Sequence, residues 1–304
     1  MQKDVQTAIL AIAIVIPLSS FFVWNSDQTS ISAKQDSSKI TAVVSFSPLY
    51  DFTKEVGKDL VEVSLLVPQG VEPHDWEPTI NDLRKMQNSD LIIVNGLGFE
   101  GWLDDVKSSV TVQIIDASFG ITTEISINDK GSKESPNDPH VWLDPIFAKT
   151  QVRNIVNGLV NLDPTNEKHF RHNEELYLAK LDALDKKIRN ELSGCRKDFI
   201  VFHSAFSYFA NRYGLNQHTI LNSNDPHSEP TAQKLTDVIK EAQRLDINII
   251  FTEEGVDSRS SEILANEIGG KVLILSPLEI FDYNESYISK MENNLSNLKE
   301  ALCS

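Results

Sequence analysis

Short hydrophobic runs alternate with amphipathic stretches along the chain from Thr41 onward. This alternation is typical of βαβ units, in which helices cover a parallel sheet. The hydrophobic runs predict four strands in each half of the chain, at residues 41–46, 61–67, 90–95 and 112–116 and then at 199–203, 219–221, 247–252 and 272–275. The pattern therefore predicts an α/β fold made of two similar lobes with parallel sheets.

One long helix is predicted between the two halves. Asp163 is a suitable N-cap, Pro164 follows it, and no glycine or proline interrupts residues 165–193. One hydrophobic stripe runs along this stretch at helical spacing, formed by Phe170, Tyr177, Leu181, Leu184, Ile188 and Leu192. We therefore expect a stiff helix of about 30 residues, roughly 45 Å long, to join the lobes.

The predicted elements divide the chain into four parts. We expect an N-terminal signal or anchor with its linker at residues 1–39 and a first α/β lobe at 40–145. Connecting helices, including the long one, are expected at 146–196, and a second α/β lobe at 197–304.

The N-terminal part contains an uncharged, mainly hydrophobic stretch at residues 7–24, with Lys3 before it and a polar segment after it. At roughly 18 residues, it lies between the core of a signal peptide and a minimal membrane span. A cleaved signal would have only a weak cleavage site near Ala33, so we favour an uncleaved anchor. The rest of the chain is then expected to be extracytoplasmic, in the periplasm or at the cell surface.

Composition and charge narrow the possible functions. The chain is 40% hydrophobic and 24% charged, which suits a globular protein. With 28 basic and 44 acidic residues its net charge is −16, which makes nucleic acid a poor partner. The only cysteines, Cys195 and Cys303, form no CxxC motif, so histidines and carboxylates would have to hold any metal. Outside the membrane these two cysteines could form one disulfide, because both belong to the second half.

Three of the seven histidines have settings that suit a metal site. His74 and His203 lie just beyond predicted strands, and His140 directly precedes a predicted helix. Each alone would more often be a structural residue, but three histidines from different βα units favour a zinc site built from both lobes. His169 and His172 are instead expected on the solvated side of the long helix. Nearby acidic residues could orient the imidazole rings, namely Glu72, Asp75, Asp138 and Asp144.

Several motifs occur in a characteristic order along the chain. They are PQGVEPHDWEPT around His74, DPHVWLDP around His140, LDPTNEKHFRHNEELYLAKLDALD at the long helix, FHSAFSYFANRYGL around His203, and IIFTEE followed by SSEILANEIGGKVLILSPLE. As a set, they resemble the zinc and manganese substrate-binding proteins of metal ABC importers, the cluster A-I family that also contains the metal-binding lipoprotein adhesins. The resemblance covers the chain from Ile40 to about Leu302.

This resemblance implies two α/β lobes joined by a rigid helix, with the metal between the lobes. It also implies an ABC permease as partner and His74, His140 and His203 as ligands. Histidine at the third position resembles the zinc-type members, whereas manganese-type members tend to carry glutamate there.

The sequence departs from the family at the fourth ligand. The family usually has an aspartate at the end of the last strand, and the matching residue here is Ser276. Water on the three histidines, Glu253 after the preceding strand, or Glu279 could replace it. Zinc-type members also often have a histidine-rich loop between the first two ligand motifs. The corresponding loop here, residues 122–138, contains no histidine.

We therefore expect a monomeric binding protein, not an enzyme, that captures Zn²⁺ and delivers it to an ABC-type permease, with Mn²⁺ as the alternative metal. The alternative function is an exported zinc hydrolase, because three histidines with an open position also describe a catalytic site. The sequence contains no HExxH motif and no separate general base at motif spacing, which favours the binding protein.

Overall fold

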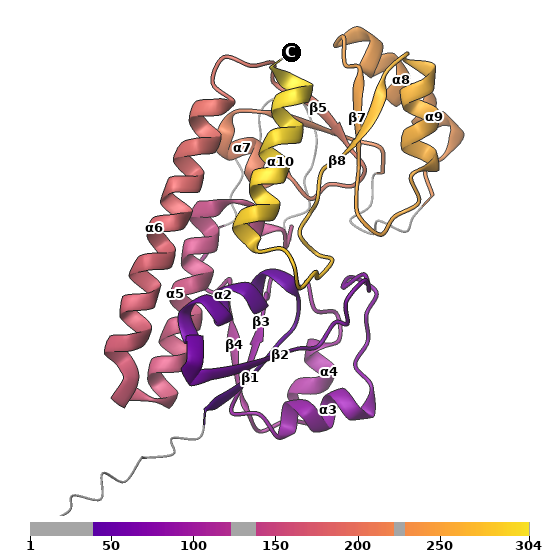
Figure 1. Ribbon diagram of the computed structural model, residues 1–304. Helices are drawn as coiled ribbons and strands as arrows, with labels where there is room; N and C mark the ends of the chain where they lie inside the picture. Colours follow the sequence, from indigo (N-terminus) through magenta and orange to yellow (C-terminus); the bar gives the residue numbers. More distant parts are fainter. Residues whose placement is uncertain (1–38, 123–137, 222–228, 304) are drawn as a thin grey trace, which may run out of the picture. The chain divides into compact units, whose positions relative to one another are not determined.

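The computed structural model describes residues 39–122, 138–221 and 229–303 (Figure 1). The hydrophobic stretch at residues 7–24 and most of the polar loop at 122–138 lie outside these ranges, so the predictions for them stay predictions. Within the described ranges, no helix is long and apolar enough to cross a membrane.

The first half of the chain forms a four-stranded parallel sheet. Its strands, in the spatial order β2-β1-β3-β4, are β1 (Ile40–Val44), β2 (Val61–Leu65), β3 (Leu91–Val94) and β4 (Gln113–Asp116). The connections contain α2 (Ser47–Gly57), η1 (Lys58–Leu60), α3 (Ile80–Gln87) and α4 (Leu103–Lys107). All four residues of the central strand β3 are hydrophobic and buried, as expected for a strand covered on both faces.

The second half repeats this arrangement. Its strands, in the order β6-β5-β7-β8, are β5 (Asp198–Val201), β6 (Asn216–Thr219), β7 (Ile249–Thr252) and β8 (Lys271–Ile274). Its helices are α7 (Ser207–Tyr213), α8 (Ala232–Arg244), α9 (Arg259–Glu267) and α10 (Tyr287–Leu302). The predicted α/β fold with two similar parallel sheets is thereby confirmed.

One strand was placed too late by the hydrophobic pattern. The pattern predicted residues 219–221, but β6 begins at Asn216 and ends at Thr219. This strand lies at the sheet edge and is polar, so it carries no hydrophobic signal. Ile220 and Leu221, which suggested the strand, are buried just beyond its end.

Two long helices follow the first sheet, and Figure 1 shows them side by side. This part of the chain consists of η2 (Val141–Leu143), α5 (Pro145–Leu162), η3 (Pro164–Asn166) and α6 (Glu167–Glu191). Asp163 caps η3, so the long helix begins at Glu167, slightly later than predicted. With 25 residues, α6 is about 38 Å long.

Helix α6 holds the two halves together. All six residues of its predicted hydrophobic stripe are buried. It packs against α2 of the first half, against α5, and against α10 at the end of the chain. The expected disulfide is also present, because Cys195, just after α6, is bonded to Cys303, just after α10.

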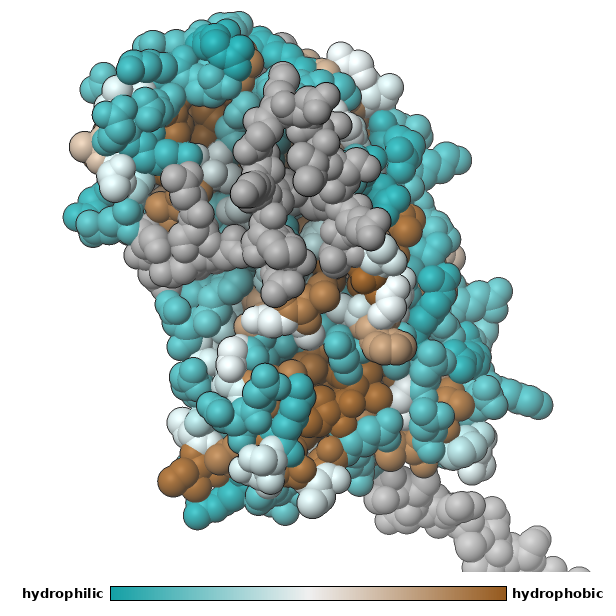
Figure 2. Space-filling view, turned by 180° about the vertical axis from the view of Figure 1, so that it is seen from behind, coloured by the Kyte–Doolittle hydropathy of each residue, from teal (hydrophilic) through white to brown (hydrophobic). Residues whose placement is uncertain are grey.

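The buried side chains form a core shared by both sheets. Ile93 of β3, Tyr177 of α6 and Phe251 of β7 belong to the same hydrophobic cluster. On the face shown in Figure 2, hydrophilic residues predominate, and hydrophobic residues gather mainly in the lower half of the view. The shared core explains how segments far apart in sequence are held at fixed positions.

The strand order prepares a ligand site. In each sheet the first and third strands are neighbours, so the chain leaves them in different directions and opens a crevice at their carboxyl ends. In the second sheet, His203 follows β5 by two residues and Glu253 directly follows β7.

Candidate metal site

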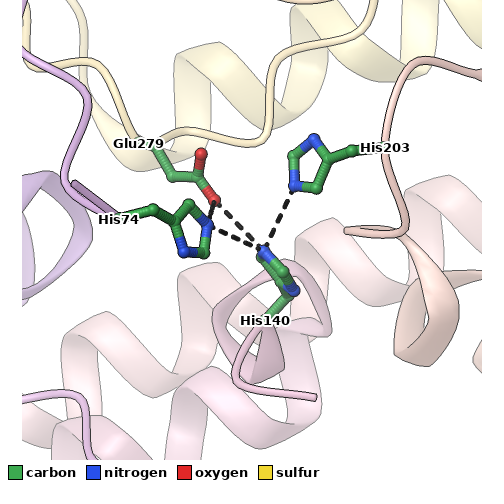
Figure 3. A group of neighbouring side chains, drawn as sticks. All are labelled: His74, His140, His203 and Glu279. Atoms are coloured by element: carbon green, nitrogen blue, oxygen red, sulfur yellow. Dashed lines mark hydrogen bonds and ion pairs between the residues drawn. The ribbon is translucent and has the colours of Figure 1, made fainter. Parts of the chain in front are cut away.

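Four side chains from distant parts of the chain converge in a small volume (Figure 3). Their potential ligand atoms all lie within 4.8 Å of one another, and the four residues are His74, His140, His203 and Glu279. His140 Nε2 lies 3.4 Å from His74 Nε2 and 3.3 Å from His203 Nε2. Glu279 Oε1 lies 3.3 Å from the Nε2 atoms of both His74 and His140.

These spacings resemble those of a tetrahedral zinc shell. With Zn–N bonds of about 2.0–2.1 Å, the ligand atoms of a regular tetrahedron are about 3.3–3.4 Å apart. Four of the six interatomic distances are 3.3–3.4 Å. The other two, from His203 to His74 and to Glu279, are at most 4.8 Å. The group could therefore hold a tetrahedral ion if His203 moved slightly inward.

Two of the histidines are held by a carboxylate in the same way. Asp138 Oδ1 accepts hydrogen bonds from the backbone N–H of His140 at 3.0 Å and from its Nδ1 at 2.7 Å. Glu253 accepts from the backbone N–H of His203 at 3.1 Å and from its Nδ1 at 2.6 Å. Because the carboxylate oxygens accept these bonds, both Nδ1 atoms carry a proton, and in each ring Nε2 is the nitrogen left to bind a metal once any proton on it has been displaced.

His74 is held differently. Its backbone N–H donates to Glu72 Oε1 at 3.2 Å, and its ring packs edge-on against Phe99. Its side chain is 13% exposed, whereas those of His140 and His203 are fully buried and Glu279 is 1% exposed. His74 therefore forms the side of the group that solvent reaches.

The buried carboxylate of Glu279 is the strongest sign that this group binds a cation. Both of its oxygens are buried, and their only polar contacts among the described residues are the 3.3 Å contacts of Oε1 with His74 and His140. Burial by itself would raise the pKa of Glu279, but the neighbouring His74, His140 and His203 hold it well below its usual range. The carboxylate is thus ionised and depends on positive charge from the histidines or from a bound ion.

The same charges act on the histidine at the centre of the group. Burial would lower the pKa of His140, but Asp138 and Glu279 raise it to about 10. In the metal-free protein, His140 therefore carries a second proton at neutral pH, on the Nε2 that faces Glu279. A metal ion would have to displace this proton.

The structure gives different positions to Ser276, which matches the family's fourth ligand, and to the two carboxylates that could replace it, Glu253 and Glu279. Glu279 belongs to the group, whereas Glu253 lies behind His203 and binds its Nδ1. Ser276 lies outside the group: its Oγ donates to Glu254 Oε2 at 2.9 Å and accepts from the backbone N–H of Leu278 at 3.1 Å. The position three residues after Ser276, within the same SPLE sequence, thus brings a carboxylate to the site.

The acidic residues that flank the motifs also have distinct positions. Asp138 and Glu72 bind groups of His140 and His74, as described above. Asp144 instead caps the N-terminus of α5 and forms an ion pair with Arg212, so its contacts stabilise the fold and do not orient a histidine ring. His169 and His172 are exposed on α6, as predicted.

Comparisons with known proteins agree with this geometry. The family model described as "Zinc-uptake complex component A periplasmic" matches residues 42–301. The chain belongs to this family. It is 36% identical over 296 residues to the high-affinity zinc uptake system protein ZnuA of Bacillus subtilis, an alignment that covers 90% of this chain and 91% of that protein.

Solved structures show the same fold. The Zn(II)-bound ZnuA-like domain of AdcA from Streptococcus pneumoniae superposes with a TM-score of 0.76 at 32% identity, covering 88% of this chain and 100% of that one. The laminin-binding protein Lmb of Streptococcus agalactiae, described as an adhesin with metal-transporting activity, has a TM-score of 0.79 at 29% identity, with 86% and 99% covered. The resemblance inferred from the motifs is confirmed.

Proposed function

We propose that this protein captures Zn²⁺ outside the cell membrane and delivers it to an ABC-type permease. The observation that carries the proposal is the group of three imidazole nitrogens and one buried carboxylate at near-tetrahedral spacing. Nitrogen donors favour Zn²⁺ over Mn²⁺, which prefers more oxygen ligands in an octahedral arrangement.

The proposed ligands are His74 Nε2, His140 Nε2, His203 Nε2 and one oxygen of Glu279. Two of the residues considered from the sequence take supporting roles in this proposal. Glu253 orients the ring of His203 and sets which nitrogen carries its proton. Ser276 shapes the turn that carries Glu279, because its hydroxyl accepts from the N–H of Leu278.

The geometry favours a carrier over a zinc hydrolase. A catalytic zinc site has three protein ligands and keeps a fourth position open for water or substrate. Here Glu279 supplies a fourth protein donor, and its oxygens have no competing hydrogen-bond partner among the described residues. Family membership points the same way, because the family is described as a component of a zinc-uptake complex.

The proposed location is the outer side of the cell membrane, with residues 7–24 as the anchor. The periplasmic family description and the Cys195–Cys303 disulfide both support an oxidising compartment outside the cytoplasm. In this proposal the protein acts as a monomer and its partners are the metal ion and the permease.

Metal titration tests the proposal. Residues 34–304 should bind one equivalent of Zn²⁺ in competition with a chromophoric chelator and bind Mn²⁺ much more weakly. His203→Ala should reduce zinc affinity strongly, whereas His169→Ala, on the exposed side of α6, is the matched control and should leave it unchanged. Equal or stronger binding of Mn²⁺ would contradict the zinc assignment, and equal losses in the two variants would contradict the ligand assignment.

A further inference from the structure

The position of Glu279 depends on the turn that carries it. This turn, residues 276–280, follows β8, and Leu278 within it has a positive φ of 63°. Asn294 of α10 binds both the N–H and the carbonyl of Ser276, at 2.8 and 2.6 Å, and Lys290 of α10 donates to the Ile280 carbonyl. These bonds join the turn to α10.

A different hydrogen bond joins the turn to the segment that carries His140. The indole N–H of Trp142 donates to the carbonyl of Pro277 at 2.7 Å. Trp142 is two residues after His140, and Pro277 is two residues before Glu279. This bond therefore connects the backbones that carry two of the proposed ligands, from segments 135 residues apart in the chain.

Trp142 is itself held firmly. Its ring is fully buried and lies 4.6 Å from the ring of Phe46 and 5.2 Å from that of His140, measured between centroids. Its carbonyl accepts a hydrogen bond from the hydroxyl of Tyr287, at the start of α10, at 2.7 Å. Trp142 thus binds both the turn and the helix that supports the turn.

We propose that Trp142 is a positioning residue of the metal site, whose hydrogen bond to Pro277 holds Glu279 at binding distance from His140. This inference rests on the proposed zinc-binding function and adds a residue that does not touch the metal. The only polar contacts that the Glu279 carboxylate makes among the described residues are those with His74 and His140 inside the group, so outside the group its place is set by the backbone of the turn. Loss of the bond from Trp142 would remove the direct link between this turn and the His140 segment and leave Glu279 less constrained.

The consequence should be seen mainly in metal release. The entrance at His74 is unchanged when Trp142 is altered, so the association rate should hold, whereas a less constrained Glu279 should let the ion leave faster. One buried hydrogen bond corresponds to roughly a fivefold change in affinity.

The test compares Trp142→Phe with Trp102→Phe in the purified full-length protein. Trp102 is also buried but packs against Trp76, so it controls for loss of a core indole. Trp142→Phe should weaken zinc binding about fivefold through faster dissociation to a chelator. Trp102→Phe should bind as the unaltered protein does. If the two variants bind zinc equally, the inference is wrong.

A double-mutant cycle separates positioning from a general effect on packing. If Trp142 acts through Glu279, Trp142→Phe should cost less than about twofold when Glu279→Gln is already present. Additive losses would overturn the inference. Co²⁺ spectra give a second measure, because the spectrum of Trp142→Phe should shift toward that of Glu279→Gln.

Tyr287→Phe keeps the test decisive if Trp142→Phe does not fold. This variant removes only the hydroxyl that binds the Trp142 carbonyl. Tyr287→Phe should weaken zinc binding by a smaller factor than Trp142→Phe, and it should cause no further loss when Glu279→Gln is present. Unchanged zinc binding in Tyr287→Phe would overturn the inference. If the unaltered protein binds no zinc, both the proposed function and this inference are wrong. If the protein binds zinc but none of these substitutions changes the affinity, only the inference about Trp142 is wrong.

Discussion

Replacing Glu253 with glutamine is expected to weaken zinc binding, although the proposed ligand set does not include Glu253. Its two oxygens serve two donors of the same residue: Oε1 accepts from the backbone N–H of His203 and Oε2 from the ring Nδ1. A glutamine has one acceptor oxygen and one NH₂ group, which can only donate. One of the two donors of His203 would therefore face another donor.

The size of the effect follows from these two contacts. A hydrogen bond to a charged group contributes about 1.5–3 kcal/mol, and a buried donor left without an acceptor costs about 1–3 kcal/mol. The ring can escape by moving its proton from Nδ1 to Nε2, but this occupies the atom that would bind zinc. We expect the zinc affinity to fall by about 10- to 100-fold, or about 1.4–2.7 kcal/mol.

Asp138 provides an internal comparison. A single oxygen, Oδ1, accepts from both the backbone N–H and the Nδ1 of His140. An asparagine can place its carbonyl oxygen at this position and keep both hydrogen bonds, so Asp138→Asn loses charge but no acceptor. Its loss of affinity should be less than about tenfold, and smaller than that of Glu253→Gln.

Competition titration with a chelator at fixed pH and ionic strength measures both variants. Glu267→Gln, which removes the same charge from an exposed position in α9, is the control and should bind zinc normally. Circular dichroism checks that each variant is folded. The reasoning is refuted if Asp138→Asn loses as much affinity as Glu253→Gln, or if Glu253→Gln behaves like the control.

Three further predictions concern the ligands, the proton and the disulfide. Glu279→Gln should lower zinc affinity at least about tenfold by removing the anionic donor, and Ser276→Ala should cost much less because Ser276 lies outside the group; the same titration compares them. Zinc binding at neutral pH should release a proton from His140, because the pKa of this residue is about 10 before the metal binds. The zinc affinity should therefore rise with pH up to about pH 10. Calorimetry in buffers of different ionisation enthalpy counts the released proton, and a zinc affinity that does not depend on pH would contradict this prediction. Cys303→Ser should lower the free energy of unfolding by about 2–4 kcal/mol, because the bond to Cys195 closes a long loop; urea denaturation measures the loss, and an unchanged midpoint would contradict it.

Local patterns in the sequence were enough to predict the class of fold. Buried parallel strands such as β3 are continuous hydrophobic runs, and the stripe on α6 repeats at helical spacing, so both are visible without any knowledge of the third dimension. The edge strand β6 was misplaced for the same reason, because its polar residues carry no such signal. The motifs around the three histidines likewise predicted which imidazoles would meet.

Only the tertiary structure decided which carboxylate faces them. Ser276, Glu253 and Glu279 all follow strands of the second sheet, and their positions in the sequence do not separate them. The direction of each side chain depends on the backbone of its loop: the turn with Leu278 at positive φ, bound by Trp142 and α10, aims Glu279 at the histidines. Glu253 directly follows β7 and points behind His203 instead. Hydrogen bonds between residues 18, 50 and 135 positions apart in the chain set these directions, and such contacts leave no periodic trace in the sequence.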